Sequence, residues 1–513
     1  MGADTAPKAG RREWLGLAVI ALPCLLYSMD LTVLNLAVPH LSADLEPSSA
    51  QLLWIVDIYG FLLAGLLITM GTLGDRIGRR RLLLIGAAAF GAASVLAAFS
   101  RSAEMLIATR ALLGVAGATL APSTLSLIRN MFFDARQRTI AVGVWITSFS
   151  VGAAIGPLLG GVLLEFFWWG SVFLLAVPVM ALLLVLGPVL LPEFRDPDAG
   201  RLDLASAALS LAAVLAVIYG LKQFAQDGLG WSPALAALAG VAIGVAFVHR
   251  QRRLAYPLID LRLFRAPAFS VSVGAIYAAV FVVAGTFLFL AQYLQLVRGE
   301  SPLAAGLWLL PATGGMVVGS IAAPAVVRRV PASFALAAGL VVAALGAAVL
   351  TQIDGRSGLG VLTVGSLLIG VGAGSIGTLA TDAVVAAAPP ERAGAASAIS
   401  ETGAEIGGAL GIAVLGSIGA AVYRNAIAIP QRVPPEDVDV ARDTLGGAVE
   451  TGKDLPASTE ADLLDAASAA FIDGLQVAAG LTAALVAAIA VAAAILLRRL
   501  PFPSEPGAEP EAA

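Results

Sequence analysis

Residues 71–81 read GTLGDRIGRRR and connect two long apolar runs. Gly71 and Gly74 are three residues apart, so they share one face of a helix and let a second helix approach closely. Gly78 permits a tight turn, and Asp75 among arginines predicts an ion-pair network that can break and re-form. A merely basic loop explains the arginines but neither the glycines nor Asp75. The residues of this predicted network, which we call the gate motif, are Gly71, Gly74, Asp75, Arg76, Gly78, Arg79 and Arg80.

The composition indicates a membrane protein. Charged residues make up 13% of the 513 residues and hydrophobic residues 59%, whereas an average soluble domain is about 25% charged. The mean hydropathy is +0.90. A soluble chain of this length needs more polar surface, so a secreted protein and a soluble enzyme are excluded. The net charge of −4 provides no basic surface for nucleic acid. We predict an all-α polytopic membrane protein.

Fourteen apolar runs are long enough to cross a bilayer core of about 30 Å as helices. They cover residues 14–39, 50–73, 82–100, 103–128, 139–164, 168–191, 203–221, 232–248, 268–296, 303–327, 332–351, 358–387, 395–422 and 472–497. A twelve-span alternative would treat 203–248 as a soluble linker. That alternative is rejected because it exposes an Ala- and Leu-rich stretch to water.

The distribution of Lys and Arg predicts the orientation. If segment 1–13 is cytoplasmic, the cytoplasmic segments hold 22 of the 31 Lys and Arg and the external segments hold eight. Such a bias places both termini in the cytoplasm, with a cytoplasmic tail at 499–513. The longest loop, 423–471, is then external. Its Ala-rich pieces near 437–448 and 459–472 are either short amphipathic helices over the outer mouth or parts of a solvated connector.

The fifth apolar run contains SVGAAIGPLLGG at residues 150–161. Its small residues and its proline are Gly152, Gly156, Pro157, Gly160 and Gly161. Small residues four apart let backbones approach, and the proline removes one helix hydrogen bond. The pattern predicts tight, bendable packing against a helix of the other half of the molecule. A generic packing motif is the alternative.

These motifs resemble those of a known family. Residues 71–81 match G-x-L-x-D-R-x-G-R-R/K, the signature loop of the major facilitator superfamily, and 328–331 (RRVP) looks like a degenerate second copy. Residues 150–161 are similar to the antiporter motif G-P-x-x-G-G of its drug/proton exporters. Further likeness to the fourteen-span drug:proton antiporter family, in particular to multidrug efflux transporters of the QacA/LfrA type, lies at 29–41, 53–59 and 293–311.

The resemblance implies a major facilitator fold, with six-helix halves at 14–192 and 268–498 and two extra central helices at 203–248. It implies alternating-access export of hydrophobic, often cationic compounds (dyes, quaternary ammonium antiseptics, antibiotics) driven by inward proton flow across a bacterial plasma membrane. The expected partners are these substrates, protons and the lipid bilayer, with no nucleic acid, and we expect a monomer. Export of one endogenous lipid, siderophore or antibiotic is an alternative in the same fold, and an uncoupled channel is another.

No cofactor, metal or catalytic residue is expected. The sequence lacks a G-x-x-x-x-G-K-[ST] phosphate loop. Its single cysteine, Cys24, lies within an apolar run, and its two histidines, His40 and His249, are far apart. These residues offer neither a nucleophile with its base nor a metal-ligand cluster, so the sequence predicts a secondary active transporter rather than an enzyme.

Charged side chains within apolar runs are costly and therefore mark function. Asp30, Asp57 and Arg110 lie at similar depth in the outer part of the N-terminal half. Arg110 matches the superfamily's fourth-span arginine, which the resemblance links to proton translocation. We expect Arg110 to pair with one carboxylate while the other titrates. A static structural ion pair is the alternative.

The C-terminal half has its own acids. Glu401 and Glu405 are four residues apart and share a helix face. Two carboxylates so close in a low dielectric do not both ionise readily, which suits a site that exchanges a proton for a cation. Asp382 is either a third inner acid or a helix-end residue. Trp54 and Trp145 are expected to line the substrate cavity and stack on flat cations, with helix packing as the alternative.

Overall fold

The computed structural model describes residues 7–47, 49–195, 203–227, 231–254, 257–354, 358–389 and 392–497. Within these ranges every regular element is helical, and fourteen helical segments are long and apolar enough to cross a membrane. The prediction of an all-α protein with fourteen spans is confirmed. The tail predicted at 499–513 lies outside the described residues.

The N-terminal half consists of seven helices that supply six spans. They are α1 (Arg11–Leu45), α2 (Ser49–Ile77), α3 (Arg79–Ala98), α4 (Ala103–Met131), α5 (Ala135–Phe166), α6 (Ser171–Leu174) and α7 (Ala176–Leu190). Side chains cap the first turns of two of these helices. At the start of α4 the Ser102 side chain accepts a hydrogen bond from the Met105 amide, and at the start of α5 the Asp134 side chain accepts one from the Gln137 amide. Helix α1 packs on α5, α2 on α4 and α3 on α7, around one apolar core.

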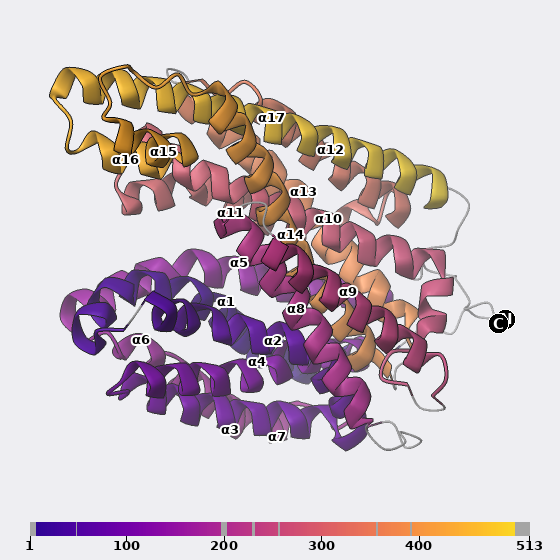
Figure 1. The fold of residues 1–513 in the computed structure, drawn as a ribbon. Coiled ribbons are helices and arrows are strands. Elements are labelled where there is room, and N and C mark those ends of the chain that lie inside the picture. Colours follow the sequence, from indigo (N-terminus) through magenta and orange to yellow (C-terminus); the bar gives the residue numbers. More distant parts are fainter. Residues whose placement is uncertain are drawn as a thin grey trace.

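The C-terminal half repeats this arrangement. Its spans are α10 (Pro267–Gln292), α11 (Pro302–Val326), α12 (Ala332–Leu350), α13 (Gly358–Ala387), α14 (Ala393–Ala426) and α17 (Ala457–Leu497). A 3-10 turn, η1 (Leu261–Arg265), precedes α10, and a π-helical turn, η2 (Tyr293–Val297), follows it. The first span packs on the fifth, the second on the fourth and the third on the sixth, as in the N-terminal half. Figure 1 shows the two halves as separate layers.

Two additional helices lie across the boundary between the halves. They are α8 (Leu204–Asp227) and α9 (Trp231–Gln251), which pack against each other. Helix α8 also contacts α2 of the N-terminal half and α14 of the C-terminal half. A small separate core joins Phe61 of α2 to Val214 and Ile218 of α8. The extra pair therefore covers the α2–α14 side of the molecule (Figure 1).

The bundle has two ends that differ in character. We call the end where α1, α3 and α14 begin the basic face, and the opposite end the loop face. The loop face carries α15 (Pro435–Asp443) and α16 (Leu445–Gly452), at the left in Figure 1.

The stretch predicted at 437–448 is thus two short helices separated at Thr444. The stretch at 459–472 is the first part of α17 and not a helix of its own, because its apolar pattern continues into the span.

Candidate functional site

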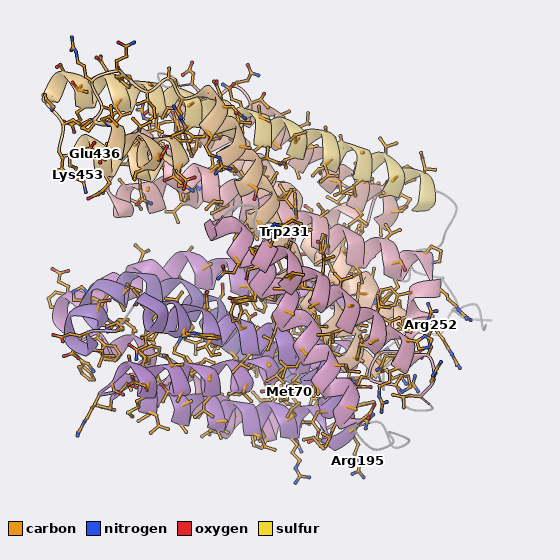
Figure 2. The ribbon with its side chains drawn as sticks, viewed as in Figure 1. Met70, Arg195, Trp231, Arg252, Glu436 and Lys453 are labelled. Carbon is orange, nitrogen blue, oxygen red and sulfur yellow. The ribbon has the colours of Figure 1, made fainter. Side chains whose placement is uncertain are left out.

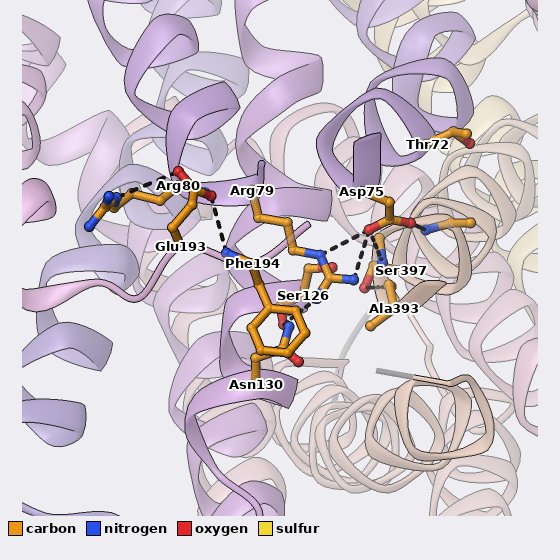
Figure 3. Close-up of polar contacts among 12 residues, drawn as sticks. Thr72, Asp75, Arg79, Arg80, Ser126, Asn130, Glu193, Phe194, Ala393 and Ser397 are labelled. Carbon is orange, nitrogen blue, oxygen red and sulfur yellow. Dashed lines mark hydrogen bonds and ion pairs between the residues drawn. The ribbon is translucent and has the colours of Figure 1, made fainter. Parts of the chain in front are cut away.

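The gate motif joins the two halves at the basic face. The buried carboxylate of Asp75, at the end of α2, accepts hydrogen bonds from Arg79 Nε at 2.9 Å and pairs with Arg79 Nη2 at 2.8 Å. It also accepts from the backbone amides of Gly394 and Ala395, at 3.1 and 3.0 Å. Those amides belong to the first turn of α14, whose partial positive charge attracts an anion. Figure 3 shows Asp75 between Arg79 and the start of α14.

The glycines of this motif allow the close approach. A Cβ atom added at Gly71 would lie 2.5 Å from the backbone oxygen of Gly394, so α2 and α14 meet there backbone to backbone. Gly78 has a φ of 110°, which disfavours a side chain. Gly74 faces Leu82 of α3 within its own half. Arg76 is half-buried on α2.

Glu193, after α7, holds the turn from α2 into α3. Its carboxylate accepts hydrogen bonds from the backbone amides of Arg80 and Arg81, both at 3.2 Å. The Arg80 side chain donates to the carbonyl oxygens of Pro188 and Leu191. Arg80 therefore anchors the motif within the N-terminal half, whereas Asp75 reaches across to the other half.

A second contact between the halves lies at the same face. Asp382, near the end of α13, accepts a hydrogen bond from Arg138 Nε and another from the Thr139 hydroxyl, both at 2.6 Å. Arg138 and Thr139 stand at the start of α5, and all three residues are buried. Arg129 of α4 adds a hydrogen bond to the Val385 carbonyl at 3.3 Å. Asp382 thus occupies a helix-end position in a bridge between the halves.

Arg110 lies buried in the N-terminal half and pairs with Asp30. The distance from Arg110 Nη1 to Asp30 Oδ2 is 2.6 Å. Arg110 Nε donates to the carbonyl oxygen of Ile55 at 3.2 Å, and its guanidinium carbon lies 4.6 Å from the centre of the Tyr59 ring. Asp57 is half-buried on the same stretch of α2, two residues beyond Ile55.

Glu401 and Glu405 lie half-buried on α14. The Tyr27 hydroxyl of α1 donates a hydrogen bond of 2.9 Å to Glu405 Oε1. This contact connects the C-terminal half to the N-terminal half in the interior of the protein. The described contacts of Asp382 are with α5, so the structure does not place it in a cluster with the two glutamates.

Tyr27 and Tyr59 bring the two acidic sites together. Their ring centres are 6.5 Å apart, and Tyr59 covers the guanidinium of Arg110. The Tyr59 hydroxyl is buried and has no hydrogen-bond partner within the described part of the chain. A continuous series of polar and aromatic groups thus runs from Glu405 through Tyr27, Tyr59 and Arg110 to Asp30.

The predicted packing of the 150–161 motif is wrong in one respect. A Cβ atom at Gly152 would clash with the backbone of Leu25, so this glycine packs on α1 of its own half. The tight contact of α5 with the other half involves Gly143, whose added Cβ atom would lie 2.8 Å from the Ser320 oxygen of α11. Helix α5 contacts α1 and α11 at different levels because it is long and lies between them.

The remaining residues of that motif, and the two tryptophans, have diverse surroundings. Gly156 and Gly160 are buried, Gly161 has open space beside it, and Pro157 lies within α5.

Trp145 is buried in the N-terminal core, and its indole nitrogen donates to Thr124 Oγ1 at 3.0 Å. Trp54 is largely exposed and packs edge-on against Phe61.

No motif in the sequence marks Tyr27, Glu193 or the Arg138–Thr139 pair as functional. Tyr27 precedes Asp30 by three residues and so shares its helix face, which was a usable signal. Arg138 lies just before the fifth apolar run, where a basic residue is expected from the orientation alone. No group of three His, Cys, Asp or Glu side chains suited to a metal ion occurs among the described residues.

Comparison with known proteins agrees with this architecture. The family model of the Major Facilitator Superfamily matches residues 20–412. The multidrug efflux pump LfrA of Mycolicibacterium smegmatis is 44% identical over 97% of this chain and 99% of its own length. The methyl viologen resistance protein SmvA of Salmonella typhimurium is 37% identical over 94% and 97%.

Solved structures share the fold. A bacterial homolog of the human lysosomal transporter Spinster has a TM-score of 0.56 at 18% identity, covering 97% of this chain and 99% of that one. The human organic anion transporter MFSD10 has a TM-score of 0.57 at 18% identity, with 79% and 93% covered. With a matching family model and relatives similar over nearly its whole length, this chain belongs to the Major Facilitator Superfamily of membrane transporters.

Proposed function

We propose that this transporter is a proton-coupled multidrug exporter at a bacterial plasma membrane, with its basic face in the cytoplasm. The observation that carries the proposal is the interior series from Glu405 to Asp30, because it places carboxylates of both halves in one connected region. Support also comes from relatives named for multidrug efflux and methyl viologen resistance. Methyl viologen is a flat aromatic dication, a class of compound suited to carboxylates and aromatic rings.

The contacts at the basic face keep that face closed in the state that the structure represents. Asp75 and Asp382 each bind the opposite half, so the halves are held together there. Export by alternating access requires these contacts to break when the binding region turns toward the cytoplasm. Rigid-body motion is favoured because each half has its own apolar core. The gate motif then acts on the rate of reorientation rather than on substrate affinity.

The carboxylates supply the coupling. The ion pair of Asp30 with Arg110 needs an ionised carboxylate, so a proton on Asp30 would free the guanidinium, which already lies against Tyr59. Glu405 accepts the Tyr27 hydroxyl hydrogen bond, and a substrate cation beside it would compete with a proton. Proton and cation therefore exclude each other at the carboxylates, which is the condition for exchange. Binding of either changes the contacts between α1, α2 and α14.

The test is ethidium transport in proteoliposomes with an imposed pH gradient. The Asp30→Asn variant keeps the size of the side chain but cannot titrate, so we expect it to lose gradient-driven transport while retaining ethidium binding. The matched control is Asp439→Asn, an exposed acid of α15 outside the interior series. Gradient-driven transport at the wild-type rate in Asp30→Asn, or wild-type transport that ignores a protonophore, would contradict proton coupling through this site.

A further inference from the structure

A cavity of about 530 Å³ lies between the extra helices and the boundary of the two halves. This volume is within the range of about 300–1,000 Å³ that ligand sites occupy. Aliphatic side chains form most of its wall. They include Val214 and Val217 of α8, Val241 and Val245 of α9, Ile68 of α2 and Ile406 of α14. The cavity therefore touches both halves and both extra helices.

The cavity lies in the part of the bundle nearest the basic face. On α9 its lining extends from Gly240 to Arg252, next to the last residue of that helix. Twelve helical residues cover about 18 Å, close to the roughly 15 Å of hydrocarbon in one leaflet. An apolar chain entering from this leaflet would match the cavity in length.

The mouth of the cavity is basic. His249 and Arg252 line it at the end of α9 and are both exposed. Arg250, between them, is bound to Asp203 by hydrogen bonds of 2.7 and 3.1 Å. Arg252 forms no ion pair with any residue in the described ranges. Figure 2 places it at the right edge of the molecule, at the basic face. Such a cation at a membrane surface attracts anionic headgroups.

Two buried hydroxyl groups in the cavity wall lack a hydrogen-bond partner among the described residues. They are those of Ser210 on α8, 2% exposed, and Thr402 on α14, 6% exposed. Gln251 donates a hydrogen bond of 2.8 Å to Ser206, so the end of α9 is level with Ser206. Ser210 lies four residues further along α8, about 6 Å deeper. Buried hydroxyls without partners are unfavourable, so a ligand with an acceptor at this depth would stabilise the wall.

We propose that this cavity binds an anionic phospholipid from the basic-face leaflet. The headgroup phosphate lies against Arg252 and His249, and an acyl chain lies along the valines of α8 and α9. The glycerol ester carbonyls, which follow directly below the phosphate, accept the hydrogen bond of Ser210. The lipid completes the packing of α9 against α2 and α14, and it is distinct from any transported substrate.

The test measures lipid retention by native mass spectrometry. Purified, delipidated full-length protein is mixed with equal amounts of phosphatidylglycerol and phosphatidylcholine of the same acyl chains. We expect the wild type to retain phosphatidylglycerol preferentially. Arg252→Ala should reduce that preference about fivefold, the effect of one cation at an anionic headgroup. The matched control Arg195→Ala, an exposed arginine of the same face (Figure 2), should keep the preference.

A second variant tests the acyl-chain position. A Cβ atom at Gly244 would meet only the Ala213 Cβ, at 3.9 Å, so the side chain of Gly244→Leu projects into the cavity. This variant should lose both lipids, whereas Gly244→Ala should retain them. Retention of both lipids by Gly244→Leu, or an unchanged headgroup preference in Arg252→Ala, would overturn the proposal. Loss of ethidium binding in Gly244→Leu without loss of lipid would identify the cavity as a substrate portal and overturn it as well.

Discussion

At the scale of single residues, Tyr27 has a role that its neighbours cannot replace. Its hydroxyl donates to Glu405 of the opposite half. Its ring is held edge-on by Phe149, with ring centres 5.5 Å apart. The ring fixes the position of the donor, and the donor orients the Glu405 carboxylate. Both functions are lost in an alanine variant, but only the second is lost in phenylalanine.

Tyr27→Phe is therefore expected to slow proton-driven ethidium transport about tenfold or more, because a hydrogen bond to a charged group contributes about 1.5–3 kcal/mol. Initial rates in proteoliposomes measure the effect. Tyr423→Phe serves as the control, since it also removes a buried hydrogen bond, from Tyr423 to the Ala441 carbonyl, but at the loop face. Equal slowing in both variants would indicate a general loss of stability instead of a role for Tyr27 in coupling.

At the scale of elements, the contact of α2 with α14 depends on the absence of side chains. Gly71 approaches the Gly394 carbonyl so closely that a methyl group must push the helices apart. Gly60 is on the same helix, and nothing lies within 4 Å of its would-be Cβ atom. Replacing each glycine by alanine therefore distinguishes two effects. Both replacements gain the higher helix propensity of alanine, up to about 1 kcal/mol, but only the one at Gly71 disturbs the contact between helices.

Gly71→Ala should open the basic face and reduce ethidium export, and Gly60→Ala should leave both unchanged. Opening can be followed by maleimide labelling of Ser397→Cys in a Cys24→Ala background, since Ser397 is fully buried on α14 beside the gate motif. We expect faster labelling with Gly71→Ala only. If labelling of the two variants were equally slow, close approach at Gly71 would not be what keeps this face closed.

The pairing of α8 with α9 has an electrostatic component. Hydrogen bonds from Arg250, and one from Ser206, hold the pKa of the Asp203 carboxyl well below its ordinary range. Because the pKa is lowered by folding, the ion pair stabilises the protein at pH values above about 4, the ordinary value for aspartate. This stabilisation is lost progressively as the pH falls further.

Asp203→Asn is accordingly expected to lower the melting temperature in detergent by a constant amount between pH 5 and pH 8, a range chosen to lie above about 4. The difference from the wild type should shrink at lower pH. Asp437→Asn, in the loop-face helix α15, controls for the removal of one negative charge. A difference that grew on acidification would mean that Asp203 does not act through its ionised form.

At the scale of the whole molecule, the two halves are joined at the basic face by two buried carboxylates, one bound to backbone amides and the other to an arginine of the opposite half. Asp75 connects α2 to α14, and Asp382 connects α13 to α5. Both acids are buried and each pairs with an arginine, Asp75 with Arg79 of its own half and Asp382 with Arg138 of the opposite half. Breaking a buried ion pair by removing one partner costs about 3–5 kcal/mol. The closed arrangement of this face therefore depends on both contacts.

Asp382→Asn should shift the population toward molecules open at the basic face. Spin labels at Arg136→Cys and Arg328→Cys, exposed positions of the two halves, would report a longer distance by pulsed electron paramagnetic resonance. The control is Asp260→Asn, which breaks a 2.8 Å ion pair with Arg392 at the same face but within the C-terminal part of the chain. An unchanged distance distribution in Asp382→Asn would show that this bridge does not hold the halves together.

The fourteen spans and the gate motif are predictable from the amino-acid sequence alone. Hydropathy is a local property, so runs such as 14–39 and 332–351 predict α1 and α12 directly. The helix of residues 168–191 was also predicted, although not its interruption between α6 and α7. The gate motif is likewise recognisable in the sequence, because Gly71, Asp75 and Arg79 follow one another at intervals of four residues within one segment of the chain.

Which distant groups meet is visible in the folded structure and not along the chain. Arg110 binds Asp30, Arg138 binds Asp382 and Tyr27 binds Glu405, across 80, 244 and 378 residues. Sequence spacing gives the face of one helix on which a side chain lies, but not the helix that this face contacts. Gly152 illustrates the limit, since its small face meets α1 and not the opposite half. Such pairings depend on how the helices pack within each half and on how the two halves dock, and both are set by the summed shape of many helices.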